Sequence, residues 1–103
     1  MIHFVYIIYS PSTDRFYIGE TKDLEGRLIQ HQTHQYSGGF TSLADDWAII
    51  LYFECSDRSQ ALNIESKIKK MKSKKHIRNL IQYPDLRQKY ASQFTGCKTI
   101  LVE

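Results

Sequence analysis

The sequence predicts a small α/β sandwich of the α+β kind, with the element order β-β-α-β-α-α and a three-stranded, mostly antiparallel sheet flanked by helices. Runs of aromatic and β-branched residues alternate along the chain with segments whose apolar residues repeat at helical spacing. The 103 residues suit one domain, because two cores of about fifty residues each would be marginally stable. With 42% hydrophobic and 24% charged residues, the composition is that of a folded chain.

Three strands are expected. Residues 2–9 and 15–20 are separated by a short segment that contains Pro11 and Asp14, and both residue types favour a tight turn. These two strands should therefore form an antiparallel hairpin. The third strand, residues 47–54, is apolar enough to lie in the middle of the sheet.

Capping residues and apolar spacing predict the helices. The first helix is expected from a cap at Thr21 or Asp23 to about residue 34, followed by a loop over residues 35–46. The second should begin near Asp57 or Ser59, break near Ser73 and continue as a third helix that ends at residue 84. Residues 1–83 then form one domain. Residues 84–103, with a short helical pattern and a closing strand over residues 99–102, are expected to be a C-terminal extension packed on it.

Positive charge is concentrated in one segment. The formal net charge is +3, but residues 1–66 carry −5 and residues 67–83 carry +7 without any acidic residue. The seven cations of this lysine block are Lys67, Lys69, Lys70, Lys72, Lys74, Lys75 and Arg78. Such a cluster favours a polyanion such as nucleic acid, and the alternative is a solvated helix end stabilised by the helix dipole.

Several classes of protein are excluded by composition. No apolar run approaches the roughly 20 residues of a membrane span, and no signal-peptide pattern is present at the N-terminus. The two cysteines, Cys55 and Cys97, form no CxxC pair, which argues against a disulfide framework or a structural zinc site. We therefore expect a cytoplasmic protein without membrane contact.

The first helix carries two polar residues on its apolar stripe. Leu24, Arg27, Leu28 and His31 lie at positions i, i+3, i+4 and i+7, so they share one face. A guanidinium there can bind a phosphate, and an imidazole can move a proton. Alternatively, the leucines pack while Arg27 and His31 lie at the rim.

A single carboxylate and three phenols complete the set of candidate groups. Glu65 lies beside the core face of the second helix and could coordinate Mg²⁺, or it could simply pair with Lys69 at i+4. Tyr6, Tyr9 and Tyr17 on the first two strands could assist proton transfer, or could pack with wet hydroxyls. Together these groups suit metal-assisted hydrolysis of a phosphodiester.

The order of these motifs resembles the GIY-YIG nuclease superfamily. Residues 4–6 (Phe-Val-Tyr) and 17–19 (Tyr-Ile-Gly) resemble its paired signature, and residues 24–31 resemble the helix that bears its Arg and His or Tyr. Residues 59–70 resemble the helix that carries the metal-binding Glu. Residues 72–77 look like the short stand-alone bacterial branch related to the N-terminal domain of the UvrC excision-repair subunit. The resemblance covers about residues 2–83.

The resemblance implies a metal-dependent DNA endonuclease, with a connection to DNA repair. It also implies a role for each matching residue: the signature tyrosines Tyr6 and Tyr17, one near the attacking water; Gly19 for close backbone approach; Arg27 on the scissile phosphate; His31 in proton transfer or holding a tyrosine hydroxyl; and Glu65 holding one Mg²⁺ or Mn²⁺. The lysine block would contact the nucleic-acid backbone.

Two departures from the family pattern leave alternatives open. Only Tyr6 matches in the first triplet, and Glu20 stands where many members have Lys, the nearest lysine being Lys22. Asn79 is a candidate for an Asn that some members use, at shifted spacing. A non-catalytic nucleic-acid-binding domain with the same fold therefore remains an alternative.

A protein-interaction module is the third alternative. It depends on aromatic residues expected to be exposed, namely Phe40, Tyr90 and Phe94. The choice between a monomer and a weak homodimer stays open.

Overall fold

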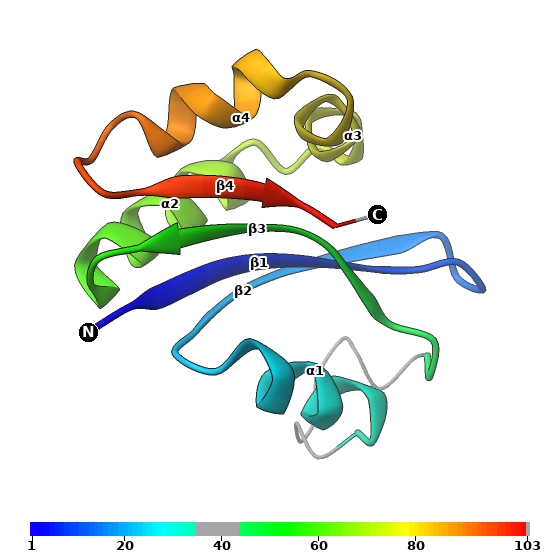
Figure 1. Ribbon diagram of the computed structural model, residues 1–103. Helices are drawn as coiled ribbons and strands as arrows, with labels where there is room; N and C mark the ends of the chain where they lie inside the picture. The colour runs from blue at the N-terminus through cyan, green and yellow to red at the C-terminus, as the bar shows by residue number, and fades with distance from the viewer. Residues whose placement is uncertain (35–43, 103) are drawn as a thin grey trace.

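A computed structural model describes residues 1–34 and 44–102 and shows an α+β fold built on one antiparallel sheet (Figure 1). The elements in chain order are β1 (His3–Ser10), β2 (Arg15–Thr21), α1 (Leu24–Gln32), β3 (Ala48–Cys55), α2 (Arg58–Lys70), α3 (Lys74–Gln82), α4 (Pro84–Ala91) and β4 (Lys98–Leu101). The sheet order is β2-β1-β3-β4, and each neighbouring pair is antiparallel. The predicted fold class is confirmed, with four strands in place of three.

Helices cover both faces of this sheet. Alternate residues of β1 point to opposite faces, so Val5 and Ile7 pack with α2, α3 and α4, whereas Tyr6 and Ile8 pack with α1. Figure 1 shows α1 alone on one side and the other three helices on the other. Trp47, expected to begin the third strand, lies just before β3 and is buried in the core on the α1 face. Strand β3, predicted to lie in the middle of the sheet, lies between β1 and β4 and contributes residues to both cores.

Side-chain caps fix where three helices begin. Asp23, Asp57 and Ser73 each accept the backbone N–H of the residue three positions later, at the starts of α1, α2 and α3. Between α2 and α3 the chain turns at Lys72, whose φ of 47° lies in the left-handed region. The expected break at residue 73 is thus a cap, and it places two lysine-bearing helix ends next to each other.

The C-terminal segment packs on the same sheet. Pro84 does not simply end a helix, because it is also the first residue of α4. The buried Arg87 guanidinium of α4 donates to the carbonyl oxygens of Leu80 and Ile81 at 2.8 and 2.7 Å, which holds the end of α3. Strand β4 then pairs with β3 at the sheet edge opposite β2.

The aromatic residues assigned to a contact surface are not exposed where the structure describes them. The Tyr90 ring meets Phe53 edge-on at 6.3 Å, and its hydroxyl lies 2.8 Å from Nε2 of His76. Tyr90 and Phe94 are half-buried against the main core, so the prediction of their exposure is wrong. Phe40 and most of the loop predicted over residues 35–46 lie outside the described residues. None of the described helices has the length and apolar character needed to cross a bilayer.

Candidate active site

The Tyr6 ring lies against the backbone of the neighbouring strand. Tyr6 on β1 pairs with Gly19 on β2, and a Cβ atom at Gly19 would come within 2.3 Å of the Tyr6 hydroxyl oxygen. A side chain at position 19 would therefore displace the phenol. The absence of a side chain lets the ring extend over β2, which is the edge strand of the sheet.

His31 holds the hydroxyl of this tyrosine. Its Nε2 lies 2.8 Å from the Tyr6 hydroxyl oxygen, and both residues are buried. Burial, and then the charge of Arg27, lower the pKa of His31 to about 4, so the imidazole is neutral at pH 7. In the tautomer that carries its proton on Nδ1, Nε2 accepts the hydrogen bond donated by Tyr6. The alternative that His31 lies at the rim does not hold.

Tyr17 connects the two helices that flank β2. Its half-buried ring lies 5.0 Å from the His31 ring of α1 and 6.3 Å from the Tyr6 ring, measured between centroids. The ammonium nitrogen of Lys69 on α2 is 6.0 Å from the Tyr17 ring centroid, within cation–π range. Tyr17 is thus the phenol of this cluster that has access to solvent.

Glu65 lies one helical turn before Lys69 on α2. Its side chain is 16% exposed, and Oε2 lies 3.5 Å from the Lys69 ammonium, so the i,i+4 pair is formed. Among residues 1–34 and 44–102 no group of three or more His, Cys, Asp or Glu side chains is placed to hold a metal. The donor set still fits Mg²⁺ or Mn²⁺, since Mg²⁺ is commonly bound by one or two carboxylates with water and substrate phosphate as further ligands.

Arg27 lines a hollow of about 480 Å³ that does not include Tyr17 or Glu65. Glu20 lies in the wall of this hollow and does not turn outward: it is 12% exposed and accepts from Nδ1 of His3 at 2.6 Å. Nε of Arg58 lies 3.5 Å from the other carboxylate oxygen. Lys22 is exposed at the same hollow. The acidic residue that departs from the family pattern is therefore paired with two basic side chains, which reduces its repulsion of a phosphate.

Arg27 and Glu65 lie on helices that cover opposite faces of the sheet, α1 on one face and α2 on the other (Figure 1). The hollow at Arg27 and the one at Tyr17 have no lining residue in common. A series of side-chain contacts runs from Tyr6 to His31, Tyr17, Lys69 and Glu65. Tyr17 and Lys69 line the second hollow, and no member of the series lines the hollow at Arg27.

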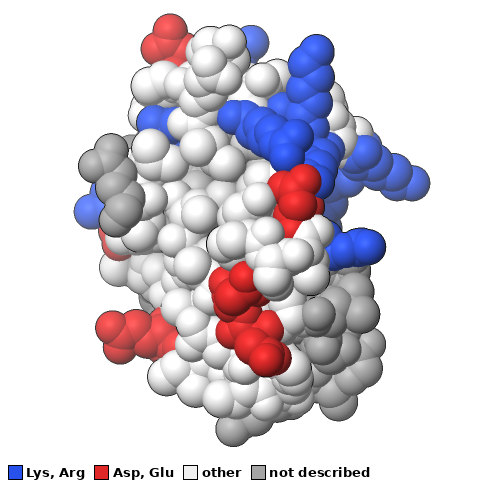
Figure 2. Space-filling view, turned by 90° about the vertical axis from the view of Figure 1, so that its right-hand side faces the viewer, with Lys and Arg blue, Asp and Glu red and all other residues white. Residues whose placement is uncertain are grey.

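The lysine block is partly neutralised. Lys67 donates to Gln93, Lys69 pairs with Glu65, and Asp14 pairs with both Lys74 and Arg78 at 2.6 and 3.1 Å. No ion pair within the described part of the chain involves the three remaining lysines, which are exposed: Lys70, Lys72 and Lys75. Figure 2 shows Lys and Arg side chains gathered on one flank, with Asp and Glu side chains lower on the same face.

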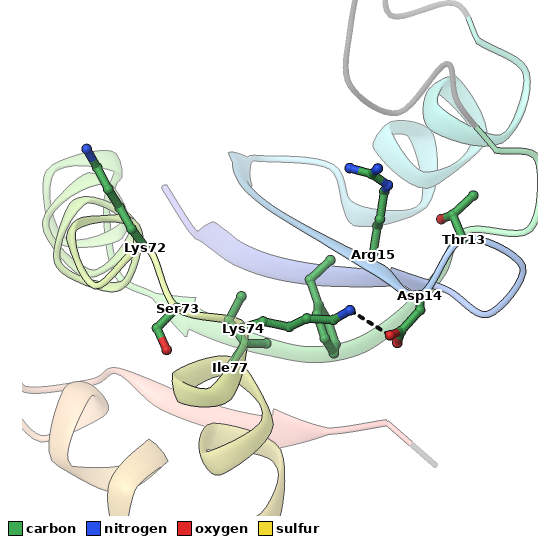
Figure 3. Close-up of a pocket in the computed structure, with 8 residues that line it drawn as sticks. Thr13, Asp14, Arg15, Lys72, Ser73, Lys74 and Ile77 are labelled. Carbon is green, nitrogen blue, oxygen red and sulfur yellow. Dashed lines mark hydrogen bonds and ion pairs between the residues drawn. The ribbon is translucent and has the colours of Figure 1, made fainter.

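Some of the site was not apparent from the sequence. His3 and Arg58 lie 17 and 38 positions from Glu20, and no local spacing links them to it. Asp14 was interpreted only as a turn residue, although it binds two cations of the lysine block, the nearer of which is drawn in Figure 3. Asn79 lies on α3, where its backbone carbonyl accepts the N–H of Tyr83.

Strands β1 and β2 thus carry the phenols of Tyr6 and Tyr17, while α1 carries Arg27 and His31 and α2 carries Glu65. A model of the GIY-YIG catalytic domain matches residues 2–79. The chain is 34% identical to "UPF0213 protein in potE 3'region" of Serratia liquefaciens over 84 residues, which is 80% of this chain and 78% of that protein. It is also 34% identical over 88 residues to a "UPF0213 protein" of Serratia proteamaculans strain 568, covering 84% and 81%. No solved structure gives a significant match.

The chain belongs to the GIY-YIG family. Membership implies a nuclease-type function with nucleic acid as the substrate. It does not identify the metal, the kind of nucleic acid or the role of any one residue.

Proposed function

We propose that this protein is a metal-dependent endonuclease that hydrolyses DNA phosphodiester bonds at the edge of β2. The observation that carries the proposal is the continuous contact from the buried Tyr6–His31 pair through Tyr17 to the helix that bears Glu65. This contact links the catalytic side-chain types of both faces at a solvent-accessible edge. In this proposal residues 1–83 form the nuclease domain. Residues 84–103 support that domain, because they contain β4, the fourth strand of the sheet.

The phenols and the imidazole position the attacking water. The half-buried Tyr17 is the residue that meets the water, because the Tyr6 hydroxyl is buried. Neutral His31 accepts the hydrogen bond of Tyr6 and so keeps that phenol protonated and fixed in place. His31 also packs on the Tyr17 ring at 5.0 Å, which orients it for its role.

Cationic side chains on both sides of the β2 edge would stabilise the negative charge of the phosphate. Arg27 presents a guanidinium, which binds two phosphate oxygens at once and stabilises the charge that develops on them. Lys22 and Arg58 at the same hollow add to the positive potential there. On the opposite side, Lys69 stands between Tyr17 and Glu65.

Glu65 is the residue that would hold the divalent cation. A bound Mg²⁺ or Mn²⁺ would lower the pKa of water and stabilise the leaving oxygen. For this chain the consequence is that Glu65 must exchange part of its contact with Lys69 for the cation. The exposed lysines Lys70, Lys72 and Lys75 would bind the DNA backbone outside this centre.

The test is a cleavage assay on supercoiled and branched DNA with Mg²⁺, Mn²⁺ or EDTA at low salt. Wild type is expected to cut only with metal, and Glu65→Gln should not cut, while its thermal unfolding stays unchanged. Glu54→Gln is the matched control, since Glu54 lies on β3 and pairs with Lys98. Metal-independent cutting, or full activity of Glu65→Gln, would contradict the proposal. DNA binding without cutting on every substrate would instead support a non-catalytic binding domain.

A further inference from the structure

The two cysteines lie opposite each other at one end of the β3–β4 pair. Glu54 of β3 is paired with Lys98, the first residue of β4. One further step along this antiparallel register places Cys55, the last residue of β3, opposite Cys97. Cys55 is buried in the core on the α2 face, and Cys97 packs against the same core. The fold thus brings together two free thiols that are 42 positions apart along the chain.

The hydrogen-bond pattern of the two strands gives this pair a short separation. Hydrogen-bonded and non-hydrogen-bonded positions alternate along antiparallel strands, and Cα atoms at the second kind are about 4.5 Å apart. The N–H of Val102 donates to the carbonyl oxygen of Ile50 at 2.9 Å, so these two residues occupy a hydrogen-bonded position. Cys55 and Cys97 are an odd number of register steps away and occupy a non-hydrogen-bonded one. A Cα separation of about 4.5 Å lies within the range that a disulfide permits.

Further contacts hold the chain before β4 against the start of α2. Gly96 has a φ of 87°, and a Cβ atom there would come within 2.7 Å of the Ser56 hydroxyl oxygen. The Cys97 thiol donates to Oε1 of Gln60 at 3.3 Å, and the same oxygen accepts the backbone N–H of Ser56 at 2.9 Å. The two chain segments are therefore already in contact, and a bond between the sulfur atoms needs little movement of the backbone.

The two thiols differ in their access to solvent. Cys55 is 1% exposed, and its burial, followed by its hydrogen bond with Cys97, raises the pKa of its thiol. Since the thiolate is the reactive form, Cys55 should react slowly with molecules in solution. Cys97 is half-buried, so its sulfur is the one that a small molecule can reach. Cys55 then lies beside that sulfur, where it can react within the same chain.

We propose that Cys55 and Cys97 form a reversible disulfide by exchange with a small-molecule disulfide such as glutathione disulfide. The Cys97 thiolate attacks one sulfur of that molecule, which gives a mixed disulfide and releases one thiol. The Cys55 thiol then loses its proton, its sulfur attacks the Cys97 sulfur, and the second thiol leaves. Two electrons pass from the protein to the small molecule, and the protons of the two cysteines end on the two thiols released. The bond fastens β4 to β3, and it is independent of the proposed function, which uses neither cysteine.

A redox titration of the full chain tests this pair. The protein is equilibrated at pH 8 in native buffer with increasing ratios of oxidised to reduced glutathione, and free thiols are then alkylated and counted by intact mass. Wild type should change from two free thiols to none, become lighter by two hydrogen atoms without a glutathione adduct, and return to two thiols with dithiothreitol. The thermal unfolding midpoint of the oxidised form should lie about 8 °C or more above that of the reduced form.

Two variants separate the pair from general oxidation. Cys97→Ser keeps a donor for Gln60 but no exposed thiol, so its unfolding midpoint should not change between the buffers. Cys55→Ala should stop at the glutathione adduct of Cys97, because no second thiol resolves it. The wild-type titration decides the matter even if a variant fails to fold. The proposal is overturned if wild type keeps both thiols, stops at the adduct, links two molecules, gains no thermal stability, or forms the bond only after unfolding in urea.

Discussion

At the scale of single residues, the site depends on one close approach and one uncharged imidazole. Gly19 leaves room for the Tyr6 ring over β2, and His31 fixes its hydroxyl at 2.8 Å in a buried environment. Both features determine where Tyr17, the solvent-accessible phenol, can lie. The free energy of unfolding of a Gly19 variant and the pH dependence of stability due to His31 can therefore test these two features without any substrate.

Gly19→Ala should destabilise the protein by about 1–3 kcal/mol, because the new methyl group would overlap the Tyr6 ring. Urea unfolding measures the change in the free energy of unfolding. Tyr6→Leu removes the overlapping hydroxyl and Cζ atoms, so the cost of Gly19→Ala should be much smaller in that background. Equal costs in the two backgrounds would show that the two residues are not in contact.

His31 makes stability depend on pH in a defined window. Its pKa is about 4 in the folded protein against 6.5 in an unfolded chain, so the unfolded state binds more protons between these values. The contribution is complete above pH 6.5 and is lost as the pH falls towards 4, by up to about 3 kcal/mol. Unfolding measured from pH 4 to 8 should show a shallower dependence in His31→Gln. The exposed His34 provides the control His34→Gln, which should keep the wild-type slope.

Much of the residue-level site followed from local sequence. Tyr6, Tyr17 and Gly19 lie on strands that the sequence predicts to pair, and helical spacing placed Arg27 and His31 on one face. The partners of Glu20 did not follow, because His3 and Arg58 reach it only through the pairing of β1 with β2 and the packing of α2. Tertiary ion pairs of this kind leave no periodic signal.

At the scale of elements, α1 and α2 cover opposite faces of one sheet. Caps at Asp23, Asp57 and Ser73 made the starts of α1, α2 and α3 predictable. The closing strand predicted over residues 99–102 is β4, which spans Lys98–Leu101. The predicted three-stranded sheet did not include it, and its pairing with β3 makes the fourth strand.

A chain that ends after Tyr83 tests the contribution of α4 and β4. Loss of β4 exposes the edge of β3, and loss of Arg87 frees two carbonyl groups at the end of α3. We expect the thermal unfolding midpoint to fall by about 10 °C or more. Arg87→Met should give a smaller decrease, and removal of residue 103 alone should have no effect. An unchanged midpoint for the truncated chain would mean that residues 1–83 are stable by themselves.

At the scale of the whole molecule, acidic side chains lie close to the cluster of Lys and Arg side chains (Figure 2). The net charge of +7 over residues 67–83 overstates the positive potential, since Asp14 and Glu65 pair with three of these cations. The sequence could not show the two ion pairs of Asp14, because Asp14 lies 60 and 64 positions from its partners. Binding of nucleic acid should therefore depend on fewer cations than the composition indicates.

The double variant Lys70→Gln/Lys75→Gln tests the exposed part of the lysine block. Both side chains are expected to meet duplex backbone, so the slope of log affinity against log salt should fall by about 1.8. Fluorescence anisotropy with a blunt duplex measures it. Lys98→Gln, whose lysine is paired with Glu54 on the sheet, should keep the wild-type slope. A similar loss in Lys98→Gln would indicate that only total charge matters.

The central claim is that α1 and α2 contribute to one active centre from opposite faces of the sheet. The most direct measurement is the single-turnover rate of DNA cleavage by Arg27→Gln on α1 and Glu65→Gln on α2, each with its DNA affinity measured in EDTA. Both rates should fall by about 100-fold or more while affinities stay within about threefold. A near wild-type rate for either variant would contradict a shared centre at the edge of β2.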